Sequence, residues 1–161
     1  MSDGLILHAI GPAQLDACAA LIDRLPLFAP YGYTSAAARR NLEDALSEGR
    51  AELLCVLDAA AGEQVAGFAW FVPRGAFDRS GYLRLIAIDD RYQGRGIGRL
   101  LMEELERRHL ARGGIALLAA ADNASAHRFY ERLGYLQVGE LKDYVKPGLH
   151  ERIYYKPAPR R

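Results

Sequence analysis

A glycine-rich segment, Gln93-Gly94-Arg95-Gly96-Ile97-Gly98-Arg99, has the residue types and spacing best suited to a specific chemistry. Its three glycines occupy every second position, between an apolar run and a stretch with helical periodicity. Glycine carries no Cβ, so the backbone N–H groups of such a turn can approach a ligand closely. Together with the dipole of the following helix, these groups form a site for anions. The segment therefore predicts a site for a phosphate-bearing molecule.

Other roles for this segment are a Walker loop, a dinucleotide-binding turn or a purely structural turn. A Walker loop is excluded because no Lys-Ser or Lys-Thr pair follows the last glycine. The dinucleotide fingerprint has the spacing G-x-G-x-x-G and follows the first strand of its fold. This segment has the spacing G-x-G-x-G and follows a late strand. A turn that only reverses the chain remains the alternative.

A second segment, from Asn123 to Tyr135, contains Ala126, the pair Phe129-Tyr130 and the pair Leu133-Gly134. The pattern Gln93-x-x-Gly96-x-Gly98 resembles the pyrophosphate loop of the Gcn5-related N-acetyltransferase (GNAT) superfamily. The second segment is similar to another signature of that family: Asn, then Ala, then Phe-Tyr, then Leu-Gly-aromatic. The two patterns occur in the family's order with a buried run over 115–120 between them, and the resemblance covers residues 82–135.

Hydrophobic periodicity predicts the elements that position these segments. Strands are expected over 5–10, 51–57, 64–72, 82–88, 115–120, 135–138 and 152–155. Helices are expected after Pro12, from 34 or 35 to about 46, over 97–110 and from Asn123 to Gly134, with a loop over 73–80. The order is β-α-α-β-β-β-α-β-α-β-β, in which the helix over 97–110 joins two neighbouring parallel strands. We expect one domain over 1–161 with an α/β fold, a mixed sheet carrying helices on both faces.

The resemblance implies a GNAT-like sheet in which the parallel strands over 82–88 and 115–120 splay apart to hold acetyl-CoA as cosubstrate. The pantetheine would pair with backbone groups of the first strand, and the pyrophosphate would lie on the loop. Arg99 could add a charged contact or be a solvated helix residue, and Asn123 is also suited to a helix N-cap. Phe129 suits core packing and could touch the cosubstrate. The implied binding residues are Ile86, Ile88, Gln93, Gly94, Arg95, Gly96, Ile97, Gly98, Arg99, Asn123 and Phe129.

The implied activity is that of an N-acetyltransferase, an acyltransferase in which a primary amine attacks the thioester directly. Tyr130 would be the catalytic residue, because a phenol with a pKa near 10 is protonated at neutral pH and can protonate the departing thiolate. Its alternative role is packing at the sheet edge. Relatives often carry an acidic base on the first splayed strand, whereas residues 82–88 contain Arg84 and no acid. His150, Glu151 or a water chain remains as the base.

The acceptor is expected to be a small-molecule amine. Arg84 shares a strand face with Tyr82, Ile86 and Ile88. If that face meets the acceptor, Arg84 would favour an amine that carries a carboxylate; otherwise it pairs with a surface acid. The alternatives in function are a CoA-binding sensor or partner module without turnover, and a protein N-terminal acetyltransferase.

Composition excludes several other classes of function. The chain has 161 residues and a formal net charge of +1, which gives no indication of nucleic acid as a partner. No apolar run is long enough for a membrane span, and the start lacks the features of a signal peptide, so a cytoplasmic location is expected. The expected oligomeric state is a monomer or a homodimer. Cys18 and Cys55 fit no metal spacing and are expected to be buried structural thiols. His109 and His127 are expected to be exposed on helices.

Overall fold

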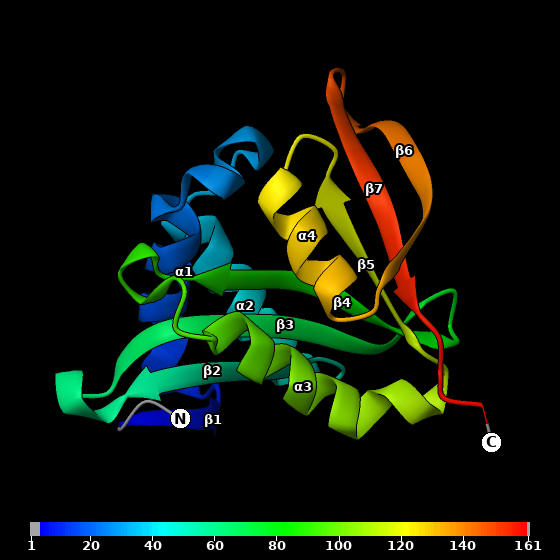
Figure 1. Ribbon diagram of the computed structural model, residues 1–161. Coiled ribbons are helices and arrows are strands. Elements are labelled where there is room, and N and C mark those ends of the chain that lie inside the picture. The colour runs from blue at the N-terminus through cyan, green and yellow to red at the C-terminus, as the bar shows by residue number, and fades with distance from the viewer. Residues whose placement is uncertain (1–3, 161) are drawn as a thin grey trace. The chain divides into compact units, whose positions relative to one another are not determined.

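The structure is a computed structural model that describes residues 4–160. The expectation about the first residues, Met1-Ser2-Asp3, lies outside this range. Seven strands are hydrogen-bonded in the order β1-β2-β3-β4-β5-β7-β6, which confirms the mixed sheet. The order of elements along the chain is also the expected one (Figure 1). No helix among the described residues is both long enough and apolar enough to cross a membrane.

The bounds of the elements follow the sequence expectations closely. The strands are β1 (Leu5–Ala9), β2 (Glu52–Asp58), β3 (Gln64–Ala76), β4 (Ser80–Ile88), β5 (Ile115–Ala120), β6 (Leu136–Lys146) and β7 (Leu149–Lys156). The helices are α1 (Leu15–Arg24), α2 (Ser35–Glu48), α3 (Ile97–His109) and α4 (Ala124–Arg132). Short 3-10 turns, η1 to η5, lie at Pro12–Gln14, Pro26–Tyr31, Ala59–Ala61, Asp90–Tyr92 and Leu110–Arg112.

The chain divides into two compact units, and β3, β4 and α3 each contribute to both. Unit 1 comprises the described part of Met1–Phe71 together with Leu85–Glu104. Unit 2 comprises Val72–Arg84 and the described part of Leu105–Arg161. The single domain expected over 1–161 stays a prediction.

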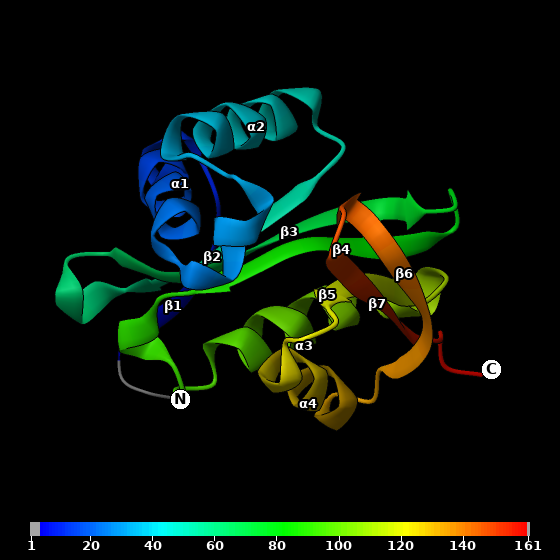
Figure 2. The same cartoon turned by 90° about the horizontal axis from the view of Figure 1, so that it is seen from above.

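Unit 1 is a three-layer arrangement around antiparallel strands. β2 pairs with β1 on one side and with β3 on the other. Helices α1 and α2 cover one face of these strands, and the first part of α3 covers the other (Figure 2). α2 begins and ends as expected, because the Thr34 hydroxyl accepts the Ala37 N–H at 3.2 Å and Gly49 closes it with φ +64°. Cys18 and Cys55 are free and buried, as expected, and burial raises the pKa of Cys55 to about 11.

Unit 2 is built around β5, which has a neighbour on each side. The start of β4 pairs with β5 in parallel over Gly81–Leu83, confirming the strand–helix–strand crossover. β7 pairs with β5 in antiparallel fashion along the whole length of β5, and β6 pairs with β7 as the edge strand of the sheet. The splaying of β4 from β5 beyond Leu83 stays a prediction.

Three local expectations are wrong. Residues 73–80 are not a loop, because β3 continues to Ala76 and β4 begins at Ser80. The turn between them uses Phe77 and Asp78 at φ +54° and +53° instead of the usual glycine, so no glycine marks where the two strands meet. The last hairpin is also longer than 135–138 and 152–155, since exposed polar residues such as Lys142 interrupt its apolar pattern. The helix after Pro12 starts with a 3-10 turn, and α1 itself begins at Leu15.

Candidate active site

A buried carboxylate at the end of β4 fixes the turn that leads into the glycine-rich loop. The Asp89 side chain is only 3% exposed. Its Oδ2 accepts Nη2 of Arg24 at 2.7 Å and Nη2 of Arg91 at 2.6 Å, and its Oδ1 accepts the Arg91 backbone N–H at 3.0 Å. The hydrogen bonds from Arg91 lower the pKa of Asp89 to about 2. Asp89 is therefore an ionised anchor and a very weak base.

Tyr92 provides a second anchor for the same turn. Its ring is buried, and its hydroxyl donates to Asp58 Oδ2 on β2 at 2.9 Å. The Arg95 guanidinium lies over the ring, 5.1 Å from its centroid. Nothing in the sequence pointed to Asp58 or to Arg24, because their partners lie 34 and 65 residues away along the chain. These are the supporting residues that sequence reasoning missed.

The loop itself has the backbone geometry that an anion site needs. Gly94 and Gly96 have φ of +76° and +78°, a region that favours glycine. The Gly96 carbonyl accepts the Leu100 N–H at 2.9 Å, so Gly96 is the N-cap of α3. The helix has no acidic residue in its first turn, and a Cβ on Gly94 or Gly96 would meet nothing within 4 Å. Helix geometry leaves four N–H groups without an intrahelical acceptor, those of Gly96, Ile97, Gly98 and Arg99.

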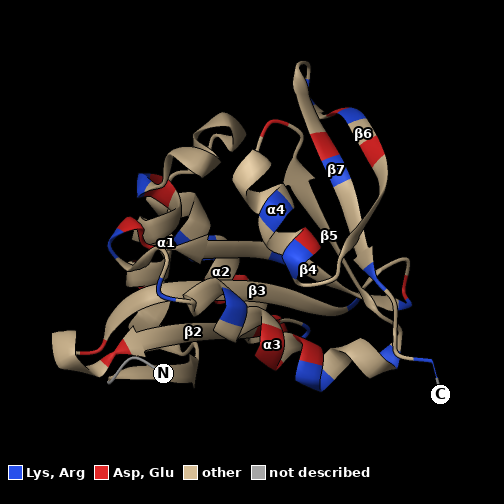
Figure 3. Ribbon diagram, in the orientation of Figure 1, with Lys and Arg blue, Asp and Glu red and all other residues tan. Residues whose placement is uncertain are grey.

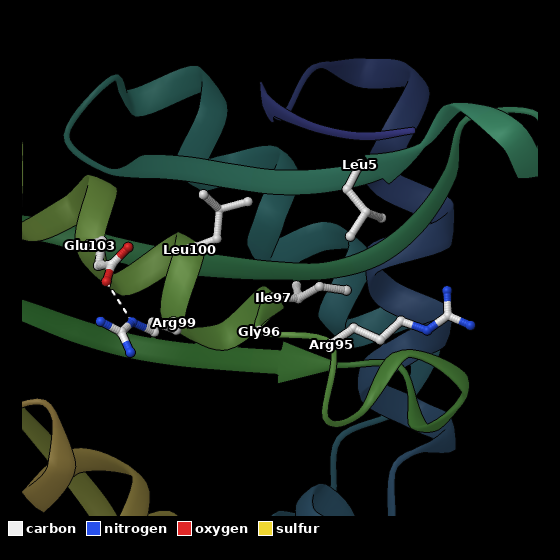
Figure 4. Close-up of a pocket in the computed structure, with 7 residues that line it drawn as sticks. All are labelled: Leu5, Arg95, Gly96, Ile97, Arg99, Leu100 and Glu103. Carbon is white, nitrogen blue, oxygen red and sulfur yellow. Dashed lines mark hydrogen bonds and ion pairs between the residues drawn. The ribbon is translucent and has the colours of Figure 1, made fainter. Parts of the chain in front are cut away.

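The polar side chains of the loop have partners within unit 1. Gln93 Nε2 donates to Asp90 Oδ1 at 2.7 Å. Arg99 Nε donates to Glu103 Oε1 at 2.6 Å on the exposed side of α3 (Figure 4). Arg95 extends away from Arg99. A small pocket of about 180 Å³ adjoins the loop, lined by Leu5, Arg95, Gly96, Ile97, Arg99, Leu100 and Glu103.

Close packing behind the loop depends on a glycine in β3. A Cβ at Gly67 would lie 2.7 Å from Ile88 Cδ1, 2.9 Å from the Ala87 carbonyl oxygen and 3.1 Å from Ile97 Cγ2. Gly67 therefore allows the end of β4 and the start of α3 to approach β3. In β4, Ile86 and Ile88 are half-buried, on the face that alternates with the buried Ala87. Unit 1 thus brings together all the predicted binding residues from Ile86 to Arg99.

Helix α4 in unit 2 carries the other three predicted site residues. Asn123 is its N-cap, with Oδ1 accepting the Ala126 N–H at 3.0 Å. Phe129 is half-buried, and its ring lies 5.1 Å from that of Tyr130. Any contact of Asn123 or Phe129 with a cosubstrate stays a prediction.

Tyr130 lies on the inner face of α4, in a group of aromatic rings. Its residue exposure is 5%, and its ring is 5.9 Å from Tyr135 and 6.1 Å from Tyr154 on β7. Burial raises the pKa of Tyr130 above its ordinary value. The phenol is therefore protonated at neutral pH, as a proton donor must be, although burial also makes it a weaker acid.

The expectation that His109 and His127 are exposed is wrong. His109 is half-buried, and His127 is 6% exposed. His127 Nε2 lies 2.9 Å from the Ala120 carbonyl, and its Nδ1 lies 3.1 Å from Nη1 of Arg152. The carbonyl can only accept and the guanidinium can only donate, so the ring carries its proton on Nε2. His127 faces inward because it is one helical turn after Asn123, on the same side of α4 as Tyr130.

Comparisons with known proteins identify the family. The profile of the acetyltransferase (GNAT) family matches residues 19–135. The chain is 30% identical over 139 residues to a mycothiol acetyltransferase of Streptomyces scabiei, covering 84% of this chain and 44% of the relative. It is 36% identical over 90 residues to the N-alpha-acetyltransferase RimI of Mycobacterium tuberculosis, covering 55% of this chain and 56% of the relative. The chain spans less than half the length of the mycothiol acetyltransferases that it matches.

Solved structures share the fold. A GNAT-family protein from Desulfovibrio desulfuricans, described as a possible acetyltransferase, superposes with a TM-score of 0.80 at 20% identity. The superposition covers 95% of this chain and 98% of the other.

Proposed function

Because the chain belongs to the acetyltransferase (GNAT) family, we propose that it transfers acetyl from acetyl-CoA to a primary amine of a small molecule. The observation that carries this proposal is the start of α3. There, two glycines with positive φ precede a helix end without acidic residues, beside open space. Free backbone N–H groups and the helix dipole suit the two negative charges of a pyrophosphate.

Each unit contains residues that we propose for binding. In unit 1, the pyrophosphate lies on the backbone of Gly94, Arg95, Gly96, Ile97 and Gly98, with Gln93 and Arg99 on either side. Arg99 reaches it only by leaving Glu103, to which it is bonded on the exposed side of α3. Backbone groups of Ile86 and Ile88 pair with the pantetheine amides. For unit 2, considered by itself, Asn123 and Phe129 are the residues proposed for contact with a cosubstrate, and the N-cap role of Asn123 leaves its amide nitrogen available.

The reaction needs a proton removed from the amine and a proton delivered to the thiolate. As the nitrogen bonds to the acetyl carbon, the carbon–sulfur bond breaks and the electron pair goes to sulfur. Tyr130 gives its phenolic proton to that sulfur. Burial supports this role because it keeps the phenol protonated over the whole neutral range.

The acceptor class is open to direct test. A relative named for mycothiol supports a small molecule, and a relative named as an N-alpha-acetyltransferase supports a protein N-terminus as the second candidate. A CoA-binding module without turnover is the third. A cytoplasmic location and a monomeric or homodimeric state remain predictions.

The experiment combines binding and turnover. Acetyl-CoA affinity is measured by calorimetry, and CoA release is followed with L-aspartate, L-phenylalaninamide, spermidine and a peptide with N-terminal alanine. We expect binding together with turnover of a small amine. Binding without turnover of any amine would indicate the module, and turnover of the peptide alone would indicate the N-terminal activity. Failure to bind acetyl-CoA would overturn the proposal.

A further inference from the structure

We propose that His127 is a positioning residue for the reaction: it holds helix α4 so that the Tyr130 hydroxyl meets the departing sulfur. This inference rests on the proposed function, because it takes Tyr130 as the donor of the proton to the thiolate. In this role His127 touches no reacting atom and acts through Tyr130. His127, Tyr130 and the partners of His127 all belong to unit 2.

Helix α4 depends on the neighbouring strands for its position. It has nine residues, of which His127 and Tyr130 are buried. These two are three positions apart, so they point to the same side of the helix, towards β5 and β7 (Figure 1). A helix this short is marginal on its own, and its contacts with the strands decide where it lies. The place of the Tyr130 hydroxyl therefore depends on how His127 is held.

His127 supplies directional bonds to two strands. Its Nε2–H donates to the carbonyl of Ala120, the last residue of β5, at 2.9 Å. Its Nδ1 accepts Nη1 of Arg152 on β7 at 3.1 Å. The Ala120 carbonyl also accepts the Asn123 N–H at 2.9 Å, so the N-cap and the buried face of α4 are both tied to the end of β5. Because hydrogen bonds fix distance and direction, the imidazole sets how α4 lies and how it is rotated against these strands.

Tyr154 on β7 connects His127 to Tyr130 by direct packing. It is 0% exposed, and its ring lies 5.9 Å from that of His127 and 6.1 Å from that of Tyr130. Its hydroxyl donates to Glu131 Oε1 at 3.3 Å, a third contact with α4. Close-packed interiors transmit small displacements, so a shift of His127 moves Tyr130 through the Tyr154 ring as well as through the helix.

The neutral imidazole suits this place because it carries a donor and an acceptor in one ring. The Ala120 carbonyl can only accept and the Arg152 guanidinium can only donate, and the imidazole offers one group to each. Arg152 Nε is already buried with no hydrogen-bond partner among the described residues, so loss of the His127 acceptor leaves the guanidinium less well satisfied. Phenylalanine keeps a ring against Tyr154 and offers neither group, whereas glutamine offers both groups without the ring.

The test is a double-mutant cycle of H127F and Y130F, with the fastest acceptor among L-aspartate, L-phenylalaninamide and spermidine. A misplacement of about 1 Å can cost on the order of 100-fold in rate, so we expect H127F to lower kcat by about that factor. KM and the acetyl-CoA dissociation constant should change little. In the Y130F background, H127F should lower kcat by no more than about threefold, because the proton donor that it positions is already absent.

Two further variants keep the test available if H127F does not fold. H127Q restores a donor and an acceptor and should recover part of the rate. R152M removes the guanidinium but keeps an aliphatic stem, and it should lower kcat only where Tyr130 is present. R128Q, at an exposed residue next to His127 in α4, is the matched control and should match wild type.

Melting temperatures are measured for every variant, and rates are compared where all of them are folded. An H127F effect of the same size with and without the Tyr130 hydroxyl, or an unchanged kcat, would overturn the positioning role while the acetyltransferase activity stands. A loss of acetyl-CoA affinity in step with the loss of kcat would do the same. A wild type that acetylates no amine would overturn the proposed function and this inference with it.

Discussion

Tyr130 and Asp89 show how burial can give two ionisable residues opposite roles. Tyr130 has aromatic neighbours, and burial raises its pKa, so it keeps its proton. The Asp89 side chain is also buried, yet the guanidinium groups of Arg91 and Arg24 lower its pKa to about 2, so it keeps its charge. The first residue can hold a proton for transfer, whereas the second can only position its neighbours.

Replacing Tyr130 by Phe removes the phenolic proton and leaves the ring packing in place. We expect kcat to fall by ~10²–10⁴-fold with little change in the dissociation constant for acetyl-CoA. Single-turnover kinetics establish that chemistry limits the rate, and Y144F, at an exposed tyrosine on β6, is the control. A variant within about threefold of wild type would assign Tyr130 to packing alone.

Asp89→Asn tests the anchor through the pH dependence of stability. The pKa of Asp89 is lowered from 3.8 to about 2 in the folded state, so its contribution is present above the unfolded value and is lost as pH falls through the folded one. At pH 7 the variant should lose about 2 kcal/mol of the free energy of unfolding. The difference from wild type should shrink between about pH 5 and 2 in urea titrations. A deficit that is independent of pH would contradict the ion-pair explanation.

At the scale of elements, the glycine-rich loop and the start of α3 form one structural unit that presents backbone N–H groups. Hydrogen bonds of Asp89 and Tyr92 fix the turn before the loop. Packing against Gly67 holds Ile97, the first residue of α3, close to the sheet. The backbone N–H groups at the helix start are thereby held in one orientation. Such preorganisation is what an anion site made of backbone groups requires.

Gly96→Asp places a carboxylate where the pyrophosphate is expected. Two like charges about 4 Å apart near a protein surface repel by about 4 kcal/mol, so acetyl-CoA affinity should fall by on the order of 100-fold or more. Calorimetry measures the affinity. G62D is the matched control, because Gly62 also has positive φ, at +70°, and open space around it, but lies in the β2–β3 turn. Near-normal affinity in G96D would show that the loop does not hold the phosphates.

The elements were largely predictable from the sequence, and their supporting contacts were not. The Thr34 and Asn123 caps, Gly49 and the apolar run of β5 are local signals, and each marks its element correctly. The extension of β3 to Ala76 was missed because its turn has no glycine. The burial of His127 and the bond from Arg24 to Asp89 depend on tertiary contacts that no local pattern encodes.

At the scale of the whole molecule, charge does not select the acceptor by long-range attraction. The formal net charge is +1, and positive and negative side chains alternate along α3 and the β6–β7 hairpin (Figure 3). Charges of both signs that alternate along these two elements largely cancel at a distance, so we expect little long-range attraction of polyamines or acids by them. We therefore expect discrimination among acceptors to come from individual side chains, and Arg84 is the single charged residue of β4.

Arg84 is exposed and lies on the strand face that also carries Glu151. A guanidinium there can hold a carboxylate through two parallel hydrogen bonds, whereas it repels a polyamine. We therefore expect L-aspartate to outperform spermidine in kcat/KM. Arg84→Ala should raise KM for L-aspartate by about 10- to 100-fold, as expected for a charged hydrogen bond worth ~1.5–3 kcal/mol. KM for L-phenylalaninamide, which has no carboxylate, should stay unchanged.

R79A, at the neighbouring turn before β4, controls for the loss of a positive charge. Faster turnover of spermidine, or equal effects of R84A and R79A, would show that Arg84 does not select the acceptor.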